Sequence, residues 1–323
     1  MRGVTTLILG AALAVPATAV AQTPIPPAAP PVRPPAKAAL QLSVRSADPA
    51  AILAGERWVV RGTLRPYVAG QRVTLRFTRH GRKFLVRALA VQRAGTFGRF
   101  QLGVTASGAG RITVAASHRR TAEQDTAVAP AVHVSVLALH AAQGSRGPAV
   151  RVLQRRLTRL GYVVGRRGLY DARTARAVLA FRKLTGMPRT FVADGGVFRA
   201  LAAGKGAFHP RFPSHGRHVE ASIAHQVVAL IAADGTVERI YPTSTGKPST
   251  PTVRGNFRVY SKTPGLNSHG MYYSAYFIRG YAVHGYFDVP TYNASHGCLR
   301  VPIPDAPAIY DWVRLGTPVD VYS

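Results

Sequence analysis

The chain has 323 residues and a strongly basic composition, with 42 lysines and arginines against 13 acidic residues and a formal net charge of +29. A chain of this length can hold two or three domains, each with its own core. The charge is uneven, because residues 1–208 carry 32 cations and 6 acids whereas residues 209–323 carry 10 and 7. The first part therefore predicts attraction to a polyanion: nucleic acid, anionic lipid or an anionic envelope polymer.

Residues 1–21 have the pattern of a cleavable export signal. Met1 and Arg2 precede an apolar run from Val4 to Val15, and the Ala-x-Ala sequence at 19–21 is typical of a cleavage site. A transmembrane anchor is the alternative, but the run is shorter than the ~20 residues that a membrane-spanning helix needs. We therefore expect an exported, extracytoplasmic protein of the cell wall. Export excludes nucleic acid as its partner and leaves anionic cell-wall polymers.

A proline-rich linker is predicted at residues 22–38, because this composition forms a stiff spacer without a packed core. Residues 39–140 then show short alternating runs between glycine-containing turns. These runs predict an antiparallel β-sandwich with an immunoglobulin-like architecture. Its alternating arginines indicate solvated strand faces rather than a dedicated binding site. The runs are residues 58–62, 72–77, 99–102 and 111–114.

Residues 143–204 predict a compact unit of three short helices. Val150, Leu153 and Leu157 recur at helical spacing, Asp171 can cap a second helix, and Asp194 precedes a third short one. The segment resembles the helical peptidoglycan-binding module of exported wall enzymes. The matching residues are Gly144-Ser145, Ala149-Val150, Leu153-Gln154, Leu160-Gly161-Tyr162, Gly168-Leu169-Tyr170-Asp171, Thr174, Ala177-Val178, Phe181, Gly186 and Asp194-Gly195.

Residues 218–323 predict a mostly β domain. Asp234-Gly235 lies between two apolar runs and indicates a hairpin. A helix is expected between Pro304 and Trp312, with Asp305 as its N-cap. Strands are expected at residues 227–232, 237–241, 256–260, 271–278, 281–284 and 318–322.

The only cysteine, Cys298, lies in the sequence Ser-His-Gly-Cys-Leu-Arg at residues 295–300, fourteen positions after His284. In an oxidising compartment an odd cysteine is either a pairing site or a reactive thiol. A nearby imidazolium or guanidinium favours the thiolate, which is the nucleophilic form. The company of His284, His296 and Arg300 therefore predicts a cysteine nucleophile that needs no metal and no cofactor.

This last segment is similar to the L,D-transpeptidase (YkuD-like) catalytic domain. The matching motifs are Ser244-Thr245-Gly246, Thr250-Pro251, Gly255-Asn256-Phe257, His284-Gly285 and the hexapeptide 295–300. The resemblance implies that Cys298 is the nucleophile and His284 the proton donor and acceptor, with His296 supporting and Arg300 as the final polar residue of the motif. It also implies acylation of Cys298 by carbapenem inhibitors.

What the resemblance implies as donor is a peptidoglycan stem tetrapeptide. Cys298 would attack the bond between the third residue and D-alanine, and an amine of a neighbouring stem would then take the acyl group in a 3-3 cross-link. The backbone around Gly297 is the expected oxyanion site, since glycine allows close approach. Tyr272 and Tyr286 are candidate walls of the substrate groove, although aromatic packing explains them equally well.

Several alternatives remain open from the sequence. Attack by water instead of an amine gives an L,D-carboxypeptidase. A zinc peptidase could use His284, His296 and Cys298 as ligands, and a non-catalytic wall-binding protein would use the last domain as a scaffold. Arg300 could hold a substrate carboxylate, pair with Asp288 or Asp305, or be solvated. His284 could be a core histidine, and His296 could serve only to fix the cysteine loop.

Overall fold

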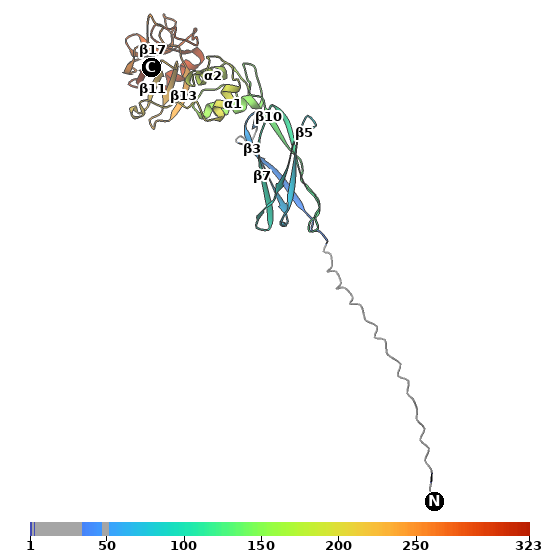
Figure 1. Cartoon of the computed structure of the whole chain (residues 1–323). Helices are drawn as coiled ribbons and strands as arrows, with labels where there is room; N and C mark the ends of the chain where they lie inside the picture. Colours follow the sequence, from blue (N-terminus) through green and yellow to red (C-terminus); the bar gives the residue numbers. More distant parts are fainter. Residues whose placement is uncertain (2, 4–33, 47–51) are drawn as a thin grey trace.

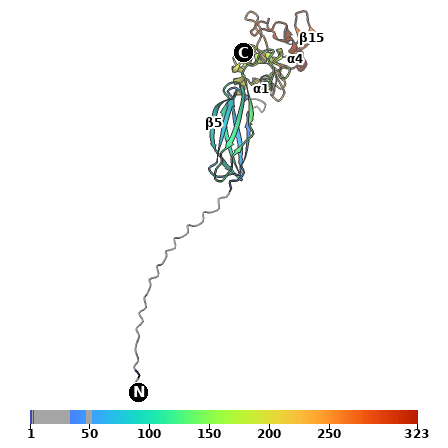
Figure 2. The same cartoon turned by 90° about the vertical axis from the view of Figure 1, so that its right-hand side faces the viewer.

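The computed structural model describes Met1, Gly3, residues 34–46 and residues 52–323. The predicted export signal, apart from Met1 and Gly3, and the linker as far as Arg33 lie outside the described residues. An elongated β domain, a small helical unit and a second β domain follow one another along the chain, with the helical unit between the two β domains (Figures 1 and 2). In the part of the chain that the structure describes, no helix combines the length and apolarity needed to cross a membrane.

The first β domain consists of two sheets that share one core. Trp58, Phe77, Phe100 and Ile112 are buried between them. One sheet has the order β1 (Ala39–Arg45), β3 (Arg57–Arg65), β7 (Phe97–Thr105), β6 (Gln92–Ala94). The other has the order β2 (Ile52–Leu53), β10 (Val132–Leu137), β8 (Gly110–His118), β4 (Arg72–Arg79), β5 (Arg82–Ala90), with β9 (Ala127–Val128) paired to β8.

All four predicted strand runs of this domain lie in strands, and each strand is longer than predicted. The antiparallel prediction is wrong for β2, which pairs in parallel with β10. Leu53 of β2 belongs to the core of the helical unit, so β2 is held beside the end of β10, where the chain leaves towards that unit. The immunoglobulin-like architecture of the two sheets stays a prediction.

The helical unit contains α1 (Pro148–Arg159), α2 (Ala172–Leu184) and α3 (Gly195–Ala202). The predicted N-cap Asp171 is confirmed, because it accepts a hydrogen bond from the Thr174 amide at 2.8 Å, and Asp194, which was expected only to precede the third helix, caps α3 by accepting one from the Val197 amide at 3.1 Å. Such caps satisfy amides that the helix itself leaves without a partner. The aspartates thus fix where α2 and α3 begin.

The second β domain has two sheets and one helix. Its core contains Val219, Val228, Leu299 and Val301 together with Trp312. The first sheet has the order β13 (Val237–Pro242), β12 (Val227–Ile231), β11 (His218–Ser222), β19 (Pro318–Tyr322), β14 (Gly255–Arg258). The second has the order β15 (Ser261–Leu266), β16 (Tyr272–Ile278), β17 (Tyr281–Tyr286), β18 (Leu299–Pro302), and α4 spans Ala306–Trp312.

Sequence reasoning missed β11, β15 and β18, and the strand expected at residues 256–260 ends at Arg258. Asp305 does precede α4, but its side chain makes no capping hydrogen bond. Instead, its buried carboxylate accepts hydrogen bonds from Arg173 at 3.2 Å and from Arg176 at 2.7 Å, both on α2. The Asp305 carboxylate therefore binds the helical unit instead of capping α4.

The helical unit and the second β domain share a core. Alternate residues of β12 face opposite ways: Val227, Ala229 and Ile231 pack in the core of the helical unit, whereas Val228 and Leu230 pack in the core of the β domain. The strand is completely buried. The helices therefore cover one face of the first sheet, and the second sheet covers the other.

Candidate active site

Cys298 lies immediately before β18, which runs parallel to β17 with His284 opposite Arg300. Val283, Leu299 and Val301 point into the core. Because side chains alternate along a strand, His284, Arg300 and Cys298 share the other face. The structure thus brings three of the predicted site residues together where β17 and β18 pair, with the Cys298 thiol half-buried and its sulfur 3.8 Å from the Gly280 carbonyl oxygen.

The turn before Cys298 depends on a glycine. Gly297 has a backbone φ of +114°, in a region that residues other than glycine rarely adopt. A Cβ there would also lie only 2.2 Å from the nearest carbon of the Tyr281 ring. The Gly297 amide, however, donates to the Ser295 hydroxyl at 3.1 Å. In this structure the amide therefore already has a partner, and the oxyanion site around Gly297 stays a prediction.

His284 is buried, and its Nδ1 lies 2.9 Å from the Gly285 carbonyl oxygen. A carbonyl only accepts, so Nδ1 carries the proton and Nε2 keeps its lone pair. Burial lowers the pKa of His284 to about 4, and the nearby Arg300 charge acts in the same direction, against an opposing contribution from the Gly285 bond. At neutral pH the ring is therefore neutral, with Nε2 able to accept a proton.

Burial has the opposite effect on the thiol and raises the pKa of Cys298. The Ala282 backbone and the Arg300 charge lower it, but by less. Both shifts follow from one cause, since burial disfavours the charged form of either group. The thiolate and imidazolium expected from sequence are therefore replaced by a neutral thiol beside a neutral imidazole.

The cysteine loop is held by hydroxyl groups rather than by His296. The Ser295 hydroxyl donates to the Cys298 carbonyl at 2.6 Å, and the Thr243 hydroxyl donates to the Arg300 carbonyl at 2.7 Å. The Ser295 amide donates to the Thr245 carbonyl at 3.0 Å. His296 is exposed, and its side chain makes no hydrogen bond to any described residue. Ser295 therefore makes the hydrogen bonds that fix the loop in this structure, and a supporting role of His296 stays a prediction.

Arg300 is buried and stacks on an aromatic ring. Its guanidinium carbon lies 4.1 Å from the centroid of Tyr286, whose ring is 5.7 Å from that of His284. Arg300 forms no ion pair with Asp288 or with Asp305, which α2 holds. The other candidate wall, Tyr272, pairs with Gly285 and packs against Tyr273 at 4.7 Å. Tyr286 therefore belongs to the immediate surroundings of His284 and Arg300.

The residues proposed as zinc ligands do not form a metal site. Across residues 34–46 and 52–323, no group of three or more His, Cys, Asp and Glu side chains is placed to hold a metal ion. His284 also uses one ring nitrogen for the Gly285 carbonyl. The geometry thus gives the zinc peptidase alternative no ligand set.

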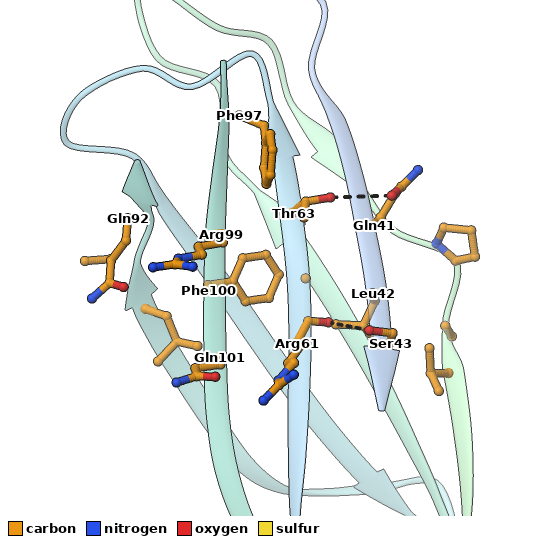
Figure 3. A pocket seen from close by; sticks show the side chains of 16 residues that line it. Gln41, Leu42, Ser43, Arg61, Thr63, Gln92, Phe97, Arg99, Phe100 and Gln101 are labelled. Atoms are coloured by element: carbon orange, nitrogen blue, oxygen red, sulfur yellow. Dashed lines mark hydrogen bonds between the residues drawn. The ribbon is translucent and has the colours of Figure 1, made fainter. Parts of the chain in front are cut away.

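Away from these residues, a hollow of about 1040 Å³ lies on the first β domain (Figure 3). Strand pairing sets Gln41, Thr63, Arg99 and Gln92 side by side across four strands, and Ser43, Arg61 and Gln101 in the next row. These side chains are exposed or half-buried. Neither Arg61 nor Arg99 has an ion-pair partner in the described part of the chain. The hollow therefore presents two cationic and several polar side chains beside apolar residues such as Leu89 and Phe97.

Two family models match the chain. The L,D-transpeptidase catalytic domain (YkuD) matches residues 216–321, and a peptidoglycan binding domain matches residues 146–201. An L,D-transpeptidase structure from Xylanimonas cellulosilytica is 36% identical, with 58% of this chain and 98% of that one covered and a TM-score of 0.54. The chain belongs to the L,D-transpeptidase family.

Other solved L,D-transpeptidase structures match a smaller share of this chain. A Mycobacterium tuberculosis enzyme is 27% identical over 33% of this chain and 58% of its own, with a TM-score of 0.31. The C442S mutant of an Enterococcus faecium enzyme is 26% identical over 33% and 50%, with a TM-score of 0.30. Comparison with curated proteins gave no match.

In this L,D-transpeptidase, sequence reasoning missed the support of the nucleophile loop. Ser244 and Thr245 were matched as part of a motif but given no function. The Ser244 hydroxyl donates to the Tyr292 carbonyl at 2.6 Å, and the Gln226 side chain donates to the Thr245 hydroxyl at 2.6 Å. The signal was the small polar motif itself, since buried hydroxyls need partners.

Proposed function

We propose that this protein is an exported peptidoglycan L,D-transpeptidase that uses Cys298 as its nucleophile. The observation that carries the proposal is the face shared by Cys298, His284 and Arg300 on two parallel strands. Family membership supports the reaction class. The substrate is a donor stem tetrapeptide whose third residue is joined through its L-centre to D-alanine.

In the acylation step, the Cys298 sulfur attacks the carbonyl carbon of the third residue. Because thiol and imidazole are both neutral, the proton moves to His284 Nε2 as the sulfur–carbon bond forms. His284 then protonates the departing nitrogen and the carbon–nitrogen bond breaks. D-alanine departs, and a thioester with Cys298 remains. We expect the acid limb of this step near pH 4, the pKa of His284, since its protonated ring cannot accept the proton.

In the second step, an amine of a neighbouring stem attacks the thioester. His284 removes a proton from the amine and returns it to the sulfur, so that the thiol is regenerated and a 3-3 cross-link forms. Water in place of the amine would make the same residues an L,D-carboxypeptidase. For the oxyanion we propose the Cys298 amide, because the Gly297 amide is bound to Ser295.

The decisive test uses the purified chain with a disaccharide-tetrapeptide and mass spectrometry of the products. We expect cross-linked dimer and free D-alanine from the wild type and neither from Cys298→Ala, while circular dichroism stays unchanged. An acyl adduct with the mass of the donor less D-alanine, or of an intact carbapenem, should appear on Cys298 alone. Turnover by Cys298→Ala would disprove the cysteine mechanism, and an inactive wild type that still binds peptidoglycan would favour the non-catalytic wall-binding alternative.

We further propose that the first β domain contacts anionic cell-wall polymers. The hollow with Arg61 and Arg99 supports this, because two guanidinium groups without ion-pair partners among the described residues lie beside amides and hydroxyls. Its volume is at the upper end of ordinary ligand sites, ~300–1,000 Å³, which suits a chain of several units. The predicted export signal at residues 1–21 supports the extracytoplasmic location, and the immunoglobulin-like architecture remains our interpretation of the two sheets.

A further inference from the structure

A small pocket lies between the helical unit and the catalytic domain, beyond the ends of β17 and β18. Its volume is about 240 Å³. Leu179 and Phe191 line it from the helical unit, and Tyr286, Phe287 and Ile303 line it from the catalytic domain. The two aromatic side chains at its rim are accessible, with 44% of Phe191 and 79% of Phe287 exposed.

The cations that border the pocket are already engaged. Arg176 donates to both oxygens of Asp305, at 2.7 and 3.1 Å. Lys183 donates to the carbonyls of Thr243 at 2.7 Å and Gln226 at 3.3 Å. Among the described residues that line the pocket, a charged ligand would therefore find no unpaired cation. Aromatic and aliphatic walls instead suit the C–H face of a sugar ring and the methyl of an acetamido group.

The pocket continues the line of the active site. In the register of β17 and β18, Cys298 lies opposite Ala282, and Tyr286 is four residues further along. At ~3.3 Å per residue, Tyr286 is about 13 Å from the nucleophile. The Tyr286 ring contacts His284 at 5.7 Å and Phe287 at 4.6 Å. Thiol, imidazole, tyrosine and pocket thus follow one strand.

This spacing matches the donor named above, and the inference rests on that proposed function. From the attacked carbonyl, the three residues of an extended stem span about 10 Å, and the linkage to the sugar adds a few more. We propose that the pocket binds the N-acetylated amino sugar that carries the donor stem, with the helical unit as one wall. A volume below the ~300 Å³ of drug-sized sites fits one ring and not a longer glycan.

The test compares D-alanine release from a disaccharide-tetrapeptide and from the sugar-free tetrapeptide, each with its free amines acetylated so that the donor cannot also act as the acceptor. The variants are Phe191→Ala and Phe287→Ala. We expect each to reduce the preference in kcat/KM for the sugar-bearing donor by about tenfold, the value of one aromatic contact. Phe84→Ala is the matched control, because Phe84 is 45% exposed on the first β domain and should leave the preference unchanged.

Equal losses on both donors, or no loss on either, would overturn the sugar subsite. A preference that depends on the variants only when a sugar-bearing acceptor is added would assign the pocket to the acceptor and also overturn it. Binding of the free disaccharide to the Cys298→Ala chain, followed by NMR, gives a readout without turnover. Binding that Phe191→Ala weakens supports the subsite even if the wild type releases no D-alanine, an outcome that would refute only the proposed reaction.

Discussion

The helical unit contacts both β domains, and the two interfaces differ in how they are packed. Towards the catalytic domain it is joined by a filled core, in which Val227, Ile231 and Ile240 are completely buried with the helices. Towards the first β domain, Leu53 enters the same core and Glu56 pairs with Arg156, but a cleft of about 430 Å³ remains between residues 53–57 and α3.

The difference indicates which parts act as one body. Burial of apolar area is the dominant favourable contribution to folding, so a shared core couples two elements more strongly than an ion pair beside a cleft. The helical unit is therefore built into the catalytic domain, although its sequence resembles a separate binding module. The first β domain, with its own core, is attached at a looser joint.

The largest effect is expected from removing the helical unit. A chain that begins at His209 would expose Val227, Ile231 and Ile240, each worth ~1.5–3 kcal/mol when buried. The sum approaches the whole stability of a typical domain, ~5–15 kcal/mol. We expect this chain to aggregate or unfold, as judged by thermal melting and gel filtration. A cooperative, active monomer would contradict the shared core.

An intermediate effect is expected from Lys183→Met. Removing the ammonium leaves the Thr243 carbonyl without its donor, at a cost of about 1–3 kcal/mol, whereas the Gln226 carbonyl keeps its hydrogen bond from the Thr243 amide. Burial lowers the pKa of Lys183 to about 7, below its value of ~10.4 in an unfolded chain. Between these values the unfolded state binds more protons, so the stability of the wild type should rise with pH from about 7 to about 10.

Lys183→Met should lose this rise, which urea unfolding at several pH values would measure. Lys205→Met is the control, because Lys205 is exposed on the same unit. Identical pH profiles of the wild type and Lys183→Met would mean that the lysine does not titrate in the joint. A simple loss of packing would lower stability equally at every pH and would not change the profile.

The fold was predictable where local patterns determine it. The caps Asp171 and Asp194 and the alternating runs of β3, β4, β7 and β8 follow from short-range rules. Asp305 shows where such rules fail, because Arg173 and Arg176 reach its carboxylate from a helix 129 or more residues away. No local pattern contains a partner at that distance.

The candidate site was predictable in its residues but not in its charges. A short motif put Cys298, His284 and Arg300 together, and the parallel pairing of β17 and β18 agrees with that grouping. Their protonation depends on burial by surrounding strands, which sequence does not give. Similarly, the sequence of the completely buried β12 predicts an ordinary apolar strand. It does not indicate that the two faces of the strand pack in different cores.

The smallest effect on turnover is expected from removing the first β domain. A chain that begins at Gln143 loses Leu53 and Ala141 from the shared core but keeps the packing between the helical unit and the catalytic domain, so D-alanine release from a soluble donor should stay within about twofold of the full chain. Binding to purified walls should fall and its salt dependence should weaken, because the hollow with Arg61 and Arg99 is gone and exposed charges are screened over ~8 Å at physiological salt. Sedimentation with walls from low to high salt measures this.

In the full chain, Arg61→Gln with Arg99→Gln should reproduce part of the loss of wall binding. Arg111→Gln with Arg119→Gln, which removes two exposed charges outside the hollow, should reduce wall binding less. Equal losses in the two double variants would mean that total charge and not the hollow attracts the wall, and unchanged binding by the shorter chain would assign wall contact to the helical unit and catalytic domain alone.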